Sequence, residues 1–70
     1  MNDLDAQMIA AHEAEDQVAL IRLYTQAADQ ANDLTAACFY LTHAYVFALE
    51  AGAPEAPGLH ARLKAHGREE

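Results

Sequence analysis

The sequence is poor in the residues that usually stabilise a very small protein. Its 70 residues include one cysteine and no tryptophan. Cys38 alone cannot form an internal disulfide, and no Cys and His residues have the spacing of a structural zinc site. Chains this small bury little of their surface, so they depend on tight helix packing or on a partner. We therefore expect one small domain over residues 1–70 that forms a homo-oligomer or docks on a protein partner.

Basic residues are also scarce. Four Lys and Arg stand against eleven Asp and Glu, which gives a formal net charge of −7. Before residue 60 the only basic residue is Arg22. A nucleic-acid interface needs a basic face that displaces counterions, so we expect none. Arg62, Lys64 and Arg68 lie near the C-terminus, where they complement the negative end of a last helix.

Long uninterrupted apolar runs are missing. Residues 1–5 are acidic and lack the apolar run of a signal peptide. Residues 34–51 form the most apolar stretch. About 20 apolar residues are needed to span a bilayer, and this stretch is interrupted by Thr35, Thr42, His43 and Glu50. We expect no membrane span and a cytoplasmic location.

Alanine is abundant and β-branched residues are few, which favours an all-α fold. We predict helices at about residues 3–31, 34–51 and 56–66, the first two forming an antiparallel hairpin. Asp33 is a suitable N-cap and Gly52 a suitable C-cap for the second helix. Leu59 and Leu63 are the expected anchors of the short last helix.

The first predicted helix contains two apolar stripes that do not align. One stripe lies within residues 17–31, and the other is formed by Leu4, Met8 and Ala11. Either the helix breaks near residues 14–17 or its first half faces a different neighbour. No Pro or Gly marks a break, so we favour one long helix with two contact faces. Leu4 and Met8 are then candidate interface residues.

The second predicted helix has more apolar surface than the chain can cover. Its apolar arc spans about 200° at 100° per residue. Ala37, Ala44 and Ala48 form a small-residue stripe that we expect to meet the stripe of Ala27, Ala28 and Ala31. The candidate core aromatics are Tyr24, Tyr40 and Phe47, and the candidate interface residues of this helix are Phe39, Tyr45 and Val46.

Residues 14–59 resemble one Sel-like repeat of the tetratricopeptide group. The resemblance is carried by residues at matching spacing: Leu20, Leu23, Tyr24, Asp33, Ala37, Tyr40, Ala44, Gly52 and Ala56. The family's glycines are replaced by Ile21, Ala27 and Asp29, and only one copy is present, whereas solenoids need about three. The resemblance implies a protein-binding scaffold without catalysis.

Residues with catalytic or metal-binding chemistry do not form a recognisable motif. His12, Glu15 and Asp16 are three possible ligands on about one helical face, which we interpret as a solvated acidic face. Nothing near Cys38 in the sequence favours a reactive thiolate, so it is expected to act as a small hydrophobe. We therefore predict no enzyme activity, no cofactor and no metal. The alternative is a ligand- or metal-responsive regulatory protein that uses His12, His43 or the acidic face.

Overall fold

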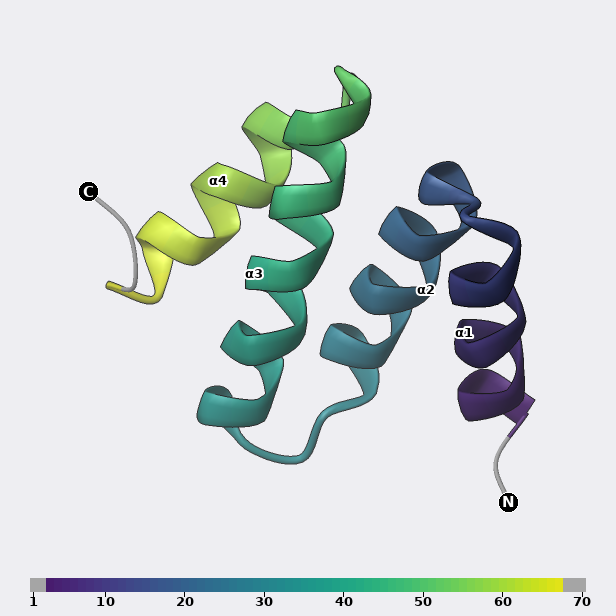
Figure 1. The fold of residues 1–70 in the computed structure, drawn as a ribbon. Helices are drawn as coiled ribbons and strands as arrows, with labels where there is room; N and C mark the ends of the chain where they lie inside the picture. The colour runs from purple at the N-terminus through teal and green to yellow at the C-terminus, as the bar shows by residue number, and fades with distance from the viewer. Residues whose placement is uncertain (1–2, 68–70) are drawn as a thin grey trace.

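The computed structural model describes residues 3–67 and contains four helices (Figure 1). They are α1 (Asp3–Ala14), α2 (Gln17–Gln30), α3 (Leu34–Ala51) and α4 (Ala56–Ala65). No strand occurs in residues 3–67, so the predicted all-α fold is confirmed. Successive helices run in opposite directions, with α1 and α4 at the two outer edges (Figure 1).

The prediction of one continuous helix over residues 3–31 is wrong, because the chain turns back between α1 and α2. Glu15 has a φ of 54°, in the left-handed region. Its N–H donates to the carbonyl of His12, and the N–H of Asp16 donates to the carbonyl of Ala11. This pair of hydrogen bonds is the Schellman motif, which usually has glycine at the left-handed position. The Asp16 carboxylate then caps α2 by accepting from the N–H of Ala19 at 3.1 Å.

The α2–α3 hairpin forms the centre of the protein. Asp33 caps α3 by accepting from the N–H of Ala36 at 2.8 Å, and Gly52 ends it with a φ of 62°. Both predicted caps are confirmed. Ala44 and Ala48 of α3 are completely buried. Ala27 and Ala28 of α2 are almost completely buried. Small side chains at these positions let the two helices approach closely.

Two groups of buried side chains lie on either side of α2. The larger group joins α2, α3 and α4, and includes Leu41 and Leu63. The smaller group joins α1 to α2, and its members are Leu4, Ala11, Leu20, Leu23 and Ala27. Leu59 and Leu63 are both buried, which confirms them as the anchors of α4.

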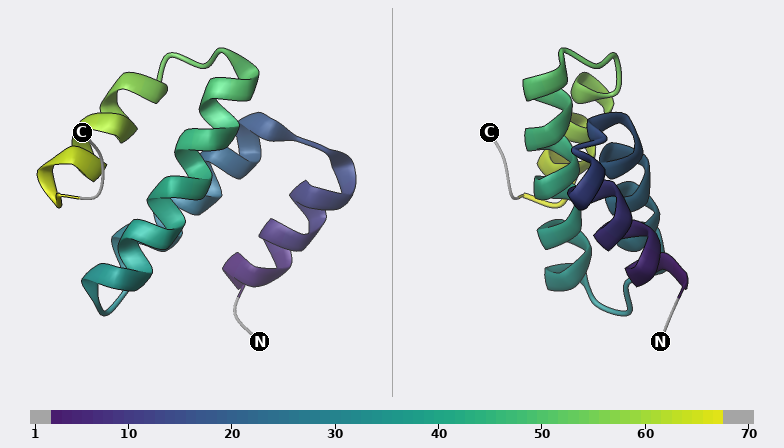
Figure 2. Two further views of the ribbon diagram at one scale, coloured as in Figure 1. Left: turned by 60° about the vertical axis from the view of Figure 1, so that its left-hand side comes forward. Right: turned by 45° about the vertical axis from the view of Figure 1, so that its right-hand side comes forward.

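The four helices form an array that is only one layer thick. The backbone of each helix packs only against its neighbours in the chain, and the principal extents are 32 × 29 × 12 Å (Figure 2). The smallest extent is less than half of either of the others, so the array is thin. Most domains instead bury their apolar faces between two layers. Each helix of this array therefore keeps one side that no other helix covers.

Candidate interaction surface

The uncovered side of α3 carries a line of apolar and hydroxyl-bearing side chains. We call it the α3 outer strip and define it as Thr35, Phe39, Thr42, Val46 and Leu49. Phe39 and Leu49 are each 56% exposed and Val46 is 46% exposed. These are three of the six large apolar side chains exposed in residues 3–67. They lie on one face because their spacings of seven and three residues bring them to similar angles around the helix.

The strip is more apolar than its two threonines suggest. The Thr42 hydroxyl donates to the carbonyl of Cys38 at 2.8 Å, so its hydrogen-bond donor is already used within the helix. No residue of the strip is charged, and the nearest carboxylate on the helix is that of Glu50 at its border. A partner that covers the strip would therefore not have to desolvate a charge.

Phe39 is held by neighbouring rings although more than half of it is exposed. Its ring centroid lies 4.5 Å from that of His43 and 5.5 Å from that of Tyr40. The Nδ1 of His43 donates to the Phe39 carbonyl at 2.9 Å, and the His43 ring stacks on Tyr24 with an interplanar angle of 15°. A side chain that is already ordered loses less conformational entropy when a partner binds it.

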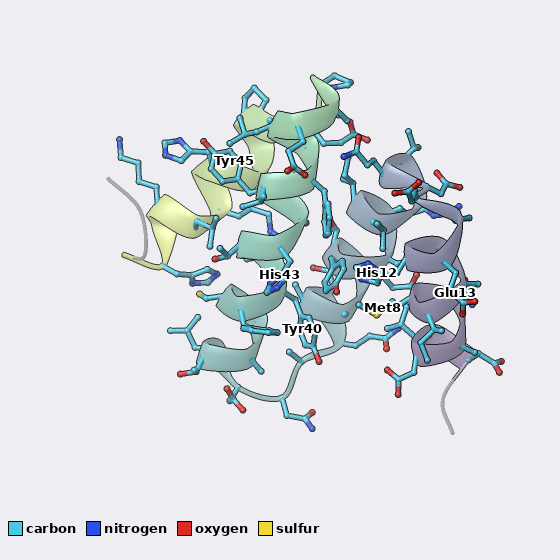
Figure 3. All side chains as sticks on the ribbon, in the orientation of Figure 1. Met8, His12, Glu13, Tyr40, His43 and Tyr45 are labelled. Atoms are coloured by element: carbon cyan, nitrogen blue, oxygen red, sulfur yellow. The ribbon has the colours of Figure 1, made fainter. Side chains whose placement is uncertain are left out.

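Rings from three helices meet beside the strip (Figure 3). The Tyr24 hydroxyl lies within hydrogen-bond distance of the His12 Nε2, at 2.9 Å. The Tyr24 ring lies 5.6 Å from Phe47 and 6.1 Å from Tyr40, measured between centroids. Burial raises the pKa of the Tyr24 hydroxyl above 10.0, with a smaller contribution from Tyr40. At neutral pH the Tyr24 hydroxyl therefore keeps its proton, and the Tyr24 side chain connects α2 to both α1 and α3.

The three predicted core aromatics, Tyr24, Tyr40 and Phe47, do pack against the buried groups. Each of them is only partly buried.

Tyr45, another predicted interface residue, lies on a different side of α3. Its ring stacks on that of His60 in α4, with centroids 5.4 Å apart and an interplanar angle of 25°. Tyr45 is only partly exposed, and the ring contact occupies one of its faces. It lies between α3 and α4, at the border of the α3 outer strip and not within it.

Leu4 and Met8 have an internal partner. Leu4 is 8% exposed within the group that joins α1 to α2, and Met8 packs against the same group. Their assignment to an intermolecular interface assumed that α1 continued straight into α2. Because the chain turns at Glu15, α1 folds back and its stripe is covered by α2. Leu4 is therefore taken up by the chain's own core, while Met8 stays partly exposed.

The candidate ligands His12, Glu15 and Asp16 do not come together as a metal site. In the described part of the chain, no group of three or more His, Cys, Asp or Glu side chains is placed to hold a metal ion. His12 contacts Tyr24, and Asp16 caps α2. Cys38 is a buried free cysteine.

The expected C-terminal basic cluster is partly used in an ion pair. Arg62 of α4 pairs with Asp29 of α2. Both side chains are well exposed, so the pair contributes little to stability, about 0.2–1 kcal/mol. Arg68 lies outside the described residues.

Leu49 is an exposed strip residue that the predicted interface set did not include. The sequence pattern that indicates Leu49 was present, since positions 35, 39, 42, 46 and 49 alternate steps of four and three residues.

By length and composition alone, α3 also meets the criteria for a membrane-spanning helix. Core helices of soluble proteins pass this test too. No family model, curated protein or solved structure matches this chain.

Proposed function

We propose that this protein is a small, non-catalytic protein–protein interaction module that binds through the α3 outer strip. It acts as a homodimer or by docking on a partner protein. The supporting observation is that Phe39, Val46 and Leu49 lie exposed on one uncharged face of a single-layer array. A partner helix or sheet on this face would provide the second layer that most domains have.

The character of the strip fits this role. Aromatic side chains often contribute a large share of the binding energy of an interface. Phe39 is such a side chain, and its contacts with His43 and Tyr40 hold it in place before any partner arrives. Ordered anchors lower the entropic cost of association.

The resemblance to a tetratricopeptide-like hairpin supports the same role. The residues that carry it include Leu23 and Tyr24 on α2, and Ala37, Tyr40 and Ala44 on α3. These two helices form the best-packed hairpin of the chain. Repeats of this kind bury their faces against neighbouring helices, so a single hairpin would need another chain to supply them.

Photo-cross-linking in the native cells tests the proposal. A benzophenone-bearing phenylalanine analogue is placed at Phe39 in one variant and at Val18 in another. Val18 is a matched control because it is 71% exposed and apolar but lies on α2, away from the strip. Irradiation is expected to give covalent protein adducts from position 39 and few or none from position 18. Equal or absent adducts at the two positions would contradict the proposal.

A further inference from the structure

The geometry of the α3 outer strip points to one occupant, a second copy of this chain bound through the same strip about a two-fold axis. This inference rests on the function proposed above and specifies the partner. The two α3 helices run antiparallel, with the axis crossing the strip between Thr42 and Val46. Phe39 of each copy then faces Leu49 of the other, and Thr42 faces Val46.

The spacing of the strip indicates that its partner is a helix. Positions 35, 39, 42, 46 and 49 alternate steps of four and three residues, which is the seam of two helices that pack at a shallow angle. Other large apolar side chains exposed within residues 3–67 are Ile9, Val18 and Leu34, and they form no such seam. In the described part of the chain, α3 is therefore the helix that presents an open seam to a second copy.

Charge favours the antiparallel orientation over the parallel one. Glu50 borders the strip at the C-terminal end of α3. In a parallel pair the two Glu50 carboxylates would lie at the same level, on the two sides of the seam, whereas in the antiparallel pair they lie at opposite ends. The dipoles of the two helices also oppose each other only in the antiparallel pair.

Side-chain volume favours the same orientation. The antiparallel pair contains two equal outer layers of Phe39 with Leu49 and two equal inner layers of Thr42 with Val46. A parallel pair would stack Phe39 on Phe39 and Thr42 on Thr42, which makes one layer wide and another narrow. Evenly filled layers pack more densely.

The area of the strip predicts a weak dimer. Phe39, Val46 and Leu49 together expose about 300 Å² of apolar surface, at the lower end of the largest patches on ordinary monomers. Two such strips would bury about 600 Å² in total, below the roughly 1,000 Å² of a stable specific interface, so the association is expected to be weak and transient. Since interfaces of about 1,600 Å² already extend to micromolar affinity, we expect a dissociation constant of roughly 10 µM or more.

The net charge gives the inference a distinctive salt dependence. Each copy carries a formal charge of −7, so two copies repel each other outside the uncharged strip. Salt shortens the range of this repulsion, with a Debye length of about 8 Å at 0.15 M. Self-association is therefore expected to strengthen as the salt concentration rises. Docking on a basic partner would weaken instead.

Sedimentation equilibrium of the whole chain, from 10 µM to 1 mM and at low and high salt, measures the association. We expect a reversible monomer–dimer equilibrium that Val46→Asp weakens at least tenfold and that Val18→Asp leaves unchanged. Both sites are exposed, so both variants should fold, and circular dichroism checks this. A monomer at every concentration and salt level, or equal effects of the two variants, would overturn the inference.

Disulfide trapping tests the orientation. Phe39→Cys and Leu49→Cys are made separately in a Cys38→Ala background and mixed under mild oxidation. Ten residues of helix span about 15 Å, and a disulfide requires Cα atoms within about 7 Å. The antiparallel pair therefore predicts the mixed 39–49 disulfide, while homodisulfides alone would overturn the antiparallel arrangement.

The adduct masses from the position-39 photo-cross-linker separate this inference from the proposed function. A mass near twice the 7.6 kDa of one chain supports the second copy. Adducts of another mass only would overturn the dimer and leave the interaction function standing, whereas no adduct would contradict both. Binding of monomers to phosphatidylcholine vesicles without dimer formation would overturn the dimer as well, with a bilayer as the occupant.

Discussion

The hydroxyl of Tyr24 and the Nε2 of His12 lie 2.9 Å apart and connect the middle of α2 to the last turn of α1. The Tyr24 ring also stacks on the ring of His43 in α3, with the two centroids 5.2 Å apart. One side chain thus contacts both helices that flank α2. The backbones of α1 and α3 do not contact each other, so the Tyr24 side chain is a link between these two helices.

Tyr24→Phe removes this hydrogen bond and keeps the ring contacts. His12 is exposed and can bond to water instead, so we expect the free energy of unfolding to fall by only about 0.5–1 kcal/mol. Chemical denaturation monitored by circular dichroism measures the change. Tyr45→Phe is the matched control, because its ring stacks on His60 and no hydrogen bond of its hydroxyl is found in residues 3–67. Equal losses in the two variants would contradict the role of the hydroxyl.

Alkaline pH should destabilise the protein through Tyr24. Burial raises the folded-state pKa of its hydroxyl above the ordinary value of 10.0. The unfolded chain therefore loses this proton first as the pH rises, and stability is present below pH 10.0 and falls between that pH and the raised folded-state pKa. Denaturation series from pH 8 to 11 measure the slope. In Tyr24→Phe the slope should be shallower than in Tyr45→Phe, and identical slopes would argue against a raised pKa at Tyr24.

Glu15→Gly should stabilise the protein. Glu15 holds a φ of 54°, where a side chain costs about 1–2 kcal/mol relative to glycine. Glycine loses more backbone entropy on folding, so we expect a net gain of about 0.5–1 kcal/mol in the free energy of unfolding. Gln26→Gly in the exposed middle of α2 is the control and should lose about 1 kcal/mol. A loss at position 15 as well would contradict the left-handed turn between α1 and α2.

Leu63→Ala and Leu49→Ala separate the core from the strip. Leu63 is completely buried, so its truncation should lower the free energy of unfolding by about 2–5 kcal/mol. Leu49 is 56% exposed, and its truncation should change monomer stability by about 0.5 kcal/mol or less. Denaturation at 2 µM, where the monomer dominates, measures both. A large loss of monomer stability in Leu49→Ala would show that the side chain belongs to the core.

Helix content and most helix ends follow from local chemistry. The abundance of alanine, the Asp33 cap, the Gly52 C-cap and the Leu59–Leu63 pair are all readable without knowledge of the fold, because each acts over one or two turns. The bounds of α3 agree with the prediction, and those of α4 agree to within one residue. The turn at Glu15 was less readable, since glutamate rarely takes a left-handed conformation. It is adopted here because it lets Leu4 pack against α2.

The sequence by itself determined that this chain is all-helical, acidic and supplied with more apolar helix surface than one hairpin can bury. Only the tertiary structure decided which part of that surface is surplus. Leu4 is buried and Met8 is partly covered once α1 folds back, and Tyr45 is shared with α4. Phe39, Val46 and Leu49 stay uncovered, because a single layer of helices has no second layer to place on that side of α3. Periodicity assigns a side chain to a face of its helix, but which faces are covered depends on how the helices fold against one another.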